Sequence, residues 1–88
     1  MNIILTNHAR FELKIRNISE EDVKFAVRNP QQKLPSKKGR VIIQNKYYDK
    51  IENKEMLLRI IGFERGDSFE VITVYKTSKI KKYWKKGE

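Results

Sequence analysis

Histidine, threonine, tyrosine and arginine side chains stand at positions where they could transfer a proton or bind a phosphate. His8 is the only histidine of the chain, and an imidazole gains or loses a proton near neutral pH. Thr73 and Tyr75 are two residues apart in a strand-like segment, so their hydroxyl groups are expected on one face. Arg59 interrupts an apolar strand pattern, and a guanidinium can bind a phosphate through two hydrogen bonds. These residue types predict acid–base chemistry on a phosphate group.

Each of these residues also has an ordinary structural explanation. His8 stands in the first turn of an expected helix, where a histidine need have no further role. Threonine and tyrosine are common in strands because they fit a pleated surface. Arg59 is either the exposed rim of a half-covered sheet face or a ligand for a phosphate. The residue types alone leave both explanations open.

The chain ends in a cluster of lysines and aromatic residues. Residues 76–88 hold six lysines and one glutamate, which is +5 of the formal net charge of +9. Lysines neutralise phosphates and aromatic rings stack on unpaired bases, so this composition predicts contact with RNA or single-stranded nucleic acid. The residues predicted to make this contact are Lys76, Lys79, Lys81, Lys82, Tyr83, Trp84, Lys85 and Lys86. The alternative is a solvated tail that Trp84 docks onto the domain.

Length and composition exclude several kinds of site. With 88 residues, the chain has room for one domain with a modest core. The absence of cysteine excludes disulfides, thiolate metal sites and cysteine nucleophiles. The apolar run at residues 3–5 is too short for a signal peptide or a membrane span, so we expect a cytoplasmic protein without membrane contact. No glycine-rich phosphate loop or carboxylate cluster with metal-ligand spacing indicates a metal or nucleotide cofactor.

The spacing of apolar residues predicts two helices in the first third of the chain. Residues 8–16 have the pattern of an amphipathic helix that ends at Asn17, a residue that tolerates the left-handed conformation. Ser19 then caps a second helix, and the three acidic residues in its first turn interact favourably with the positive end of the helix dipole. Asn29-Pro30 ends this second helix.

The rest of the chain is predicted to be a loop followed by strands. Residues 30–40 contain both prolines and are expected to be irregular. Residues 41–51 form one bent strand or two short ones, and residues 56–77 form an antiparallel hairpin. The side chains expected to share one face of its second strand are Phe69, Val71, Thr73, Tyr75 and Thr77. The predicted fold is α+β, with two N-terminal helices packed on a three- or four-stranded antiparallel sheet over residues 1–77, and a basic tail or short helix over residues 78–88.

Four short motifs resemble an uncharacterised family of small prokaryotic domains that is known only as a domain of unknown function. They are Thr6-Asn7-His8-Ala9-Arg10-Phe11, Arg16-Asn17-Ile18-Ser19-Glu20-Glu21-Asp22-Val23, Asn29-Pro30 and Val71-Ile72-Thr73-Val74-Tyr75. The resemblance spans most of the chain. Two positions depart from the family's pattern, because Glu12 replaces a frequent arginine and Asn17 replaces a glycine. The Glu12 carboxylate weakens any anion site built on that arginine, and Arg16 remains.

The order of helices and strands is also similar to that of the RelE and BrnT toxins, which are small basic ribonucleases that a partner antitoxin holds inactive. This similarity implies a RelE-like architecture with a site where the first helix meets the sheet. The residues whose types fit such a site are His8, Arg16 or Arg59, Thr73, Tyr75 and the tail lysines.

We therefore expect a RelE-like toxin that acts as a metal-independent RNA endonuclease. His8 would serve as general base or acid, Tyr75 as its partner in proton transfer, and Thr73 would orient the phosphate. The groups that would stabilise negative charge in the transition state are Arg16, Arg59 or Lys76. Its expected partners are single-stranded or ribosome-bound RNA and an acidic antitoxin. The alternative is a non-catalytic RNA- or protein-binding module of the same fold.

Overall fold

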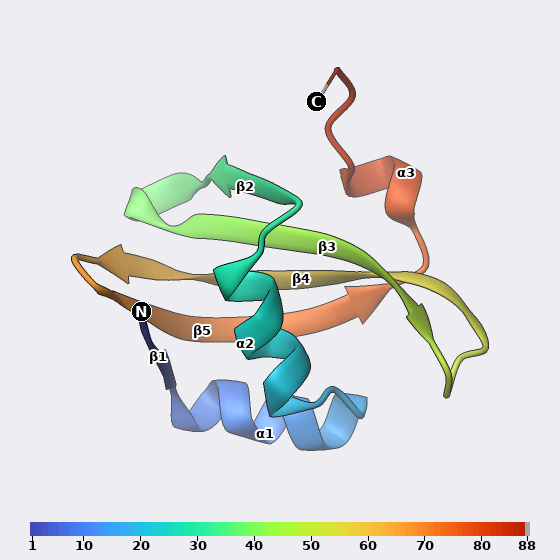
Figure 1. The fold of residues 1–88 in the computed structure, drawn as a ribbon, viewed down its shortest axis with the longest axis horizontal. Coiled ribbons are helices and arrows are strands. Elements are labelled where there is room, and N and C mark those ends of the chain that lie inside the picture. The colour runs from blue at the N-terminus through green and yellow to red at the C-terminus, as the bar shows by residue number, and fades with distance from the viewer. Residues whose placement is uncertain (88) are drawn as a thin grey trace.

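A computed structural model describes residues 1–87, which form a five-stranded sheet and three helices (Figure 1). In chain order the elements are β1 (Asn2–Leu5), α1 (Asn7–Arg16), α2 (Glu20–Arg28), β2 (Gln32–Pro35), a 3₁₀ turn (Lys37–Gly39), β3 (Val41–Asp49), β4 (Lys54–Arg65), β5 (Ser68–Thr77) and α3 (Ile80–Tyr83). The strand order is β1-β5-β4-β3-β2, antiparallel throughout except for the parallel pair of β1 and β5. This confirms the α+β class. Within residues 1–87, the helices lack the length and apolar character that a membrane span needs.

The sheet has more strands than predicted, and one of them lies in the expected loop. Gln32–Pro35 pairs antiparallel with Val41–Gln44 as β2, and the backbone of Ser36 hydrogen-bonds that of Arg40 in the connection. Pro35 is tolerated because β2 is an edge strand, where a missing N–H breaks no ladder. The prediction of an irregular segment over residues 30–40 was therefore wrong at Gln32–Pro35.

Both N-terminal helices begin and end at residues that cap them. The Thr6 hydroxyl accepts a hydrogen bond from the backbone N–H of Ala9, and the Ser19 hydroxyl accepts one from that of Asp22. Asn17 adopts the left-handed conformation (φ 54°) and closes α1, as the sequence predicted. These capping interactions are local, so they define where the helices begin and where α1 ends without help from tertiary packing.

Helix α1 lies along the edge of β5, in the place where a further strand would pair. Strand β1 covers only the first half of that edge, because its pairing with β5 ends at Leu5 and Val71. The chain then turns into α1, and the backbone N–H of Thr6 donates to the carbonyl oxygen of Val71. Figure 1 shows α1 following β5 beyond the end of β1. The second half of the β5 edge therefore faces helix side chains instead of a strand.

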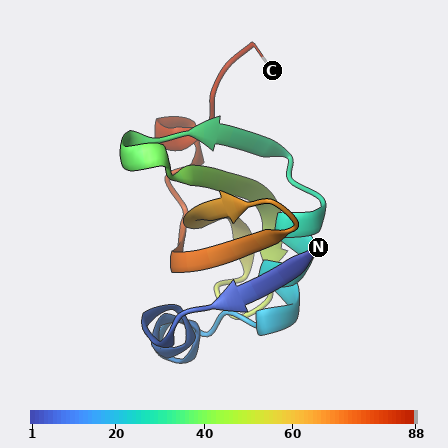
Figure 2. The same cartoon turned by 90° about the vertical axis from the view of Figure 1, so that its left-hand side faces the viewer.

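The core lies between the two N-terminal helices and one face of the sheet. Its buried members from the helical half are Leu5, Ala9, Leu13, Ile18, Val23, Ala26 and Val27, and those from the strands are Ile43, Leu58, Ile60, Phe69, Val71 and Val74. Figure 2 shows α2 and the C-terminal segment on opposite sides of the sheet. The second sheet face, which carries Thr73 and Tyr75, is called the open face below.

A β-bulge in β5 decides which side chains reach the open face. Ile61 of β4 pairs with Thr73, but Gly62 pairs with Val71, so Ile72 is an extra residue in β5. The bulge reverses the alternation of side chains, and Val71 points to the core while Thr73 and Tyr75 point to the open face. The prediction that Phe69 and Val71 share a face with Thr73 and Tyr75 was therefore wrong, whereas Thr73 and Tyr75 do share one.

Replacing Gly62 by alanine is expected to lower the free energy of unfolding by about 1–3 kcal/mol. A Cβ atom at this position would meet the backbone carbonyl oxygen of Glu70 and lie 2.7 Å from Cε1 of Phe69, so the bulge would have to shift. Urea unfolding measures the change, with Glu55→Ala at an exposed position of the same strand as the control. An unchanged midpoint for Gly62→Ala would show that the bulge does not depend on glycine.

Candidate functional site

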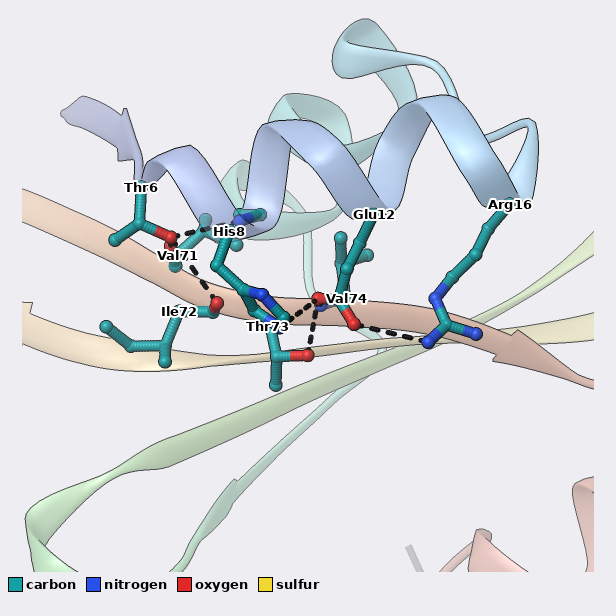
Figure 3. Close-up of polar contacts among 9 residues, drawn as sticks. Thr6, His8, Glu12, Arg16, Val71, Ile72, Thr73 and Val74 are labelled. Atoms are coloured by element: carbon teal, nitrogen blue, oxygen red, sulfur yellow. Dashed lines mark hydrogen bonds and ion pairs between the residues drawn. The ribbon is translucent and has the colours of Figure 1, made fainter.

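A buried carboxylate stands where α1 meets the edge of β5. Oε1 of Glu12 accepts hydrogen bonds from the backbone N–H of Val74 at 3.0 Å and from the Thr73 hydroxyl (Figure 3). Glu12 is only 5% exposed. Its position follows from the fold, because α1 replaces a strand here and the edge N–H of Val74 needs another acceptor. Glu12 therefore attaches α1 to the sheet and ties Thr73 to the helix.

Two side chains that can carry positive charge flank this carboxylate, one turn before and one turn after it on α1. Nε2 of His8 lies 3.5 Å from Oε1 of Glu12, and a guanidinium nitrogen of Arg16 lies 3.3 Å from Oε2. The side chains of His8 and Arg16 are 65% and 42% exposed. Glu12 thus holds an accessible imidazole and an accessible guanidinium side by side.

The pKa of the Glu12 carboxyl is lowered by its surroundings. Burial opposes ionisation, but the hydrogen bonds from Thr73 and Val74, together with attraction to Arg16 and to His8 when it is protonated, outweigh burial. Glu12 is therefore ionised at neutral pH, and the carboxylate is the form that holds its neighbours in place.

Glu12 should contribute to stability in a pH-dependent way. Because its pKa is lower in the folded than in the unfolded chain, its contribution is present above the unfolded value of about 4.3 and is lost as the pH falls through the folded value. We expect Glu12→Gln to be less stable than the wild type at pH 7, with the difference shrinking towards pH 3. Urea unfolding across this range measures the difference. A difference that does not change with pH would contradict this role of the carboxylate.

A row of four polar side chains crosses the open face next to Thr73. Strand pairing places Gln32, Gln44, Arg59 and Tyr75 directly opposite one another on β2, β3, β4 and β5. Nε2 of Gln44 donates to Gln32 at 2.7 Å, and Nε of Arg59 donates to Gln44 at 3.0 Å. A terminal nitrogen of Arg59 donates to the Tyr75 hydroxyl. Arg59 is thus fixed between an amide and a phenol.

The C-terminal segment packs on this row. The Gln44 amide donates to the carbonyl oxygen of Tyr83, and the Tyr83 ring lies over Arg59 with its centroid 4.2 Å from the guanidinium carbon. Nζ of Lys46 lies 4.1 Å from the centre of the Trp84 ring, so Trp84 docks against β3. The lysines of this segment that remain exposed are Lys79, Lys81, Lys82, Lys85 and Lys86. The segment is therefore bound to the sheet through its aromatic residues and backbone, and it presents lysines to solvent.

Lys76 lies away from both groups. Side chains alternate along β5, so Lys76 points to the face opposite Tyr75, where its Nζ is 2.8 Å from Oδ2 of Asp49, and the two side chains are 9% and 6% exposed. Asp49 also accepts hydrogen bonds from the Tyr47 hydroxyl and from two backbone N–H groups in the turn after β3. The hydrogen bond from Lys76 is the main reason that the pKa of Asp49 is well below its usual value. The pKa of Tyr47 is raised, first by burial and then by its hydrogen bond to the Asp49 carboxylate. Lys76 therefore stabilises the hairpin of β3 and β4. It does not lie beside the residues with which it was predicted to act.

The structure brings His8, Arg16 and Thr73 together around Glu12, and it brings Arg59 and Tyr75 together on the open face. Thr73 links them, because its hydroxyl bonds Glu12 and its side chain shares a face with Tyr75, about 7 Å along the strand. The sequence analysis left three residues out of the site, namely Glu12, Gln32 and Gln44. In the sequence, Glu12 stands out only as a departure from a family pattern. The apolar residues near it gave no signal that it is buried, because Phe11 and Ile15 of α1 are themselves exposed. Gln44 follows the apolar run at residues 41–43 of β3 and is itself followed by polar residues, so nothing within that strand marked it as part of the row.

Chemically, the arrangement offers proton transfer and binding of an anion. His8 provides a base, Tyr75 provides a phenol, and Arg16 with Arg59 provides guanidinium groups. Among residues 1–87, no three histidine, aspartate or glutamate side chains converge in the way that a metal ion requires.

Comparison with known proteins identifies the family. No curated protein and no solved structure matches this chain. The similarity to RelE and BrnT toxins therefore stays a prediction, whereas the resemblance to an uncharacterised domain family is confirmed. The match to that family covers residues 5–82 and so includes α1, strands β2 to β5 and the start of the C-terminal segment. The chain belongs to the family described as Domain of unknown function (DUF4258).

Proposed function

We propose that this protein is a RelE-like endoribonuclease that cleaves single-stranded RNA without a metal ion. One observation carries the proposal: His8, Arg16 and Thr73 converge on the buried carboxylate of Glu12. Tyr75 and Arg59 stand next to them on the same side of the sheet. An accessible base, a phenol and two cations around one position are the groups that transesterification of a phosphodiester needs.

The reaction would use the 2′-hydroxyl of the substrate as the nucleophile. His8 accepts the proton of this hydroxyl while the 2′-oxygen forms a bond to the adjacent phosphorus. The bond from phosphorus to the 5′-oxygen of the next nucleotide breaks, and Tyr75 donates its proton to that leaving oxygen. The products are a 2′,3′-cyclic phosphate and a 5′-hydroxyl. The hydrogen bond that Tyr75 accepts from Arg59 would stabilise the phenolate that the proton transfer leaves behind.

The remaining residues would bind the substrate. Arg16 and Arg59 lie on either side of Thr73 and Tyr75, where they would stabilise the extra negative charge on phosphorus in the transition state. Beside Thr73, the half-buried residues Ile42 and Ile61 form an apolar row on the open face against which a base could pack. Such contacts need an unpaired base, and the nucleophile needs ribose, so the substrate is single-stranded RNA.

A substrate with one altered sugar tests this mechanism. An RNA oligonucleotide that the protein cuts at a known position is resynthesised with a single 2′-deoxy nucleotide on the 5′ side of that cut. We expect cleavage at this position to disappear while binding is retained. Cleavage that continues at the deoxy position would exclude activation of the 2′-hydroxyl.

A second candidate function is binding without cleavage, and the exposed lysines of the C-terminal segment favour it. They border the docked Tyr83 and Trp84, a combination that suits RNA and would also suit an acidic protein such as an antitoxin. Salt-sensitive binding of RNA without any cut product would favour this candidate over the enzyme.

A further inference from the structure

The C-terminal segment is held on the sheet through its backbone. The Gln32 amide both accepts from the backbone N–H of Lys85, at 3.2 Å, and donates to its carbonyl oxygen, at 2.9 Å. The Gln44 amide donates to the carbonyl oxygen of Tyr83 at 2.9 Å. Gln32 is 4% exposed and Gln44 is fully buried. Two buried amides therefore fix the path of the segment, and this path determines where the Tyr83 ring lies.

The Tyr83 ring covers one face of the Arg59 guanidinium. Its centroid is 4.2 Å from the guanidinium carbon, compared with 5.7 Å for the ring of Tyr75. The two tyrosine rings meet edge to face, with centroids 6.5 Å apart. Hydrogen bonds to Gln44 and Tyr75 fix the guanidinium within its plane, and the Tyr83 ring stabilises it from above through a cation–π contact.

We propose that Tyr83 is a positioning residue of the site, which holds the Arg59 guanidinium and, through it, the Tyr75 hydroxyl in the orientation used for cleavage. This inference rests on the proposed function. It gives the C-terminal segment two separate tasks. Tyr83 orients groups that act on the phosphate, whereas the exposed lysines of the segment contact the RNA backbone.

Two substitutions of Tyr83 distinguish the effect of its aromatic ring from the effect of its apolar bulk. Tyr83→Phe keeps the aromatic face, and Tyr83→Leu keeps an apolar side chain but removes that face. We expect Tyr83→Leu to lower kcat by roughly ten- to a hundredfold with little change in KM, because a misplaced catalytic group slows the chemical step more than it weakens binding. Tyr83→Phe is expected to restore most of the lost rate. A kcat for Tyr83→Leu equal to that of the wild type would overturn the proposal.

A spectroscopic measurement tests the same contact without any activity. The NMR signal of the Arg59 Nε–H group, assigned by its loss in Arg59→Lys, should carry a ring-current shift in the wild type and in Tyr83→Phe. This shift should become much smaller in Tyr83→Leu, where only the more distant Tyr75 ring remains. An Arg59 signal that is the same in all three proteins would overturn the proposal. If the wild type cuts no RNA, the proposed function fails, and the Arg59 signal still decides whether Tyr83 holds the guanidinium.

The only tryptophan of the chain provides a control for docking. Trp84 lies next to Tyr83 and packs against Lys46, so its emission spectrum reports whether the segment stays on the sheet. An unchanged spectrum in Tyr83→Leu assigns the loss of rate to the missing ring. If that variant releases the segment, Tyr83→Met, whose flexible side chain also lacks a ring, replaces it in both measurements.

Discussion

Replacing His8 by alanine is expected to lower the rate of RNA cleavage by roughly 10²- to 10⁴-fold, the contribution typical of a positioned general base or acid. RNA affinity should be nearly unchanged, because the cations of the site and the exposed lysines remain. The fold should also be unaffected, since the His8 side chain is 65% exposed and its contact with Glu12 is long, at 3.5 Å. Cleavage rates and binding constants measured on the same RNA test both parts of this expectation.

Lys14→Ala is the matched control for the substitution of His8. Lys14 is exposed on the same helix and lies outside the group around Glu12, so its loss should leave cleavage at the wild-type rate. Urea unfolding of both variants confirms that neither change acts through stability. If His8→Ala cuts RNA as fast as Lys14→Ala does, His8 is only a helix-start residue.

Replacing Lys76 by methionine is expected to lower the free energy of unfolding by roughly 3–5 kcal/mol, the usual cost of leaving one charge of a buried pair without its partner. Methionine keeps the length and apolar stem of lysine, so the effect isolates the lost ammonium group. Domains of this size are stable by only about 5–15 kcal/mol, and the change is therefore a large part of the total. The midpoint of urea unfolding at pH 7 measures it.

Two comparisons identify the buried pair as the cause. Lys79→Met removes an exposed lysine from the same end of the chain and should change stability by less than about 0.5 kcal/mol. The double variant Asp49→Asn with Lys76→Met should be more stable than Lys76→Met alone, because no unpaired charge is then buried. Equal losses for Lys76→Met and Lys79→Met would mean that Lys76 is a surface lysine, as the sequence had suggested.

Local signals predicted the helices well. Ser19 and Asn17 act through contacts within a few residues of themselves, so the sequence around them was sufficient to predict the end of α1 and the start of α2. Strand β2 could not be found in this way. Gln32–Pro35 is short, polar and ends in proline, and it becomes a strand only because β3 offers it a partner. Its edge position, which depends on the whole sheet, makes that composition acceptable.

The residues of the site were predictable by type, but their arrangement was not. Strict alternation along β5 would place Val71 and Thr73 on one face, and the extra residue Ile72 breaks this rule. The role of Glu12 depends on α1 lying where a strand would otherwise pair. Lys76 belongs to a charged run in the sequence, yet its partner Asp49 is 27 residues away along the chain. Each of these features depends on contacts between segments that are far apart in the sequence. The pattern of residues within one segment therefore could not predict it.

We infer that this chain cleaves RNA by itself through acid–base chemistry. The most direct test is incubation of the purified protein with a mixed-sequence, end-labelled RNA in the presence of EDTA, beside His8→Ala, with the products resolved on a denaturing gel. We predict discrete cuts that carry 2′,3′-cyclic phosphate ends and that vanish in the His8 variant. Intact RNA in every lane, or the same cuts with both proteins, would contradict the claim.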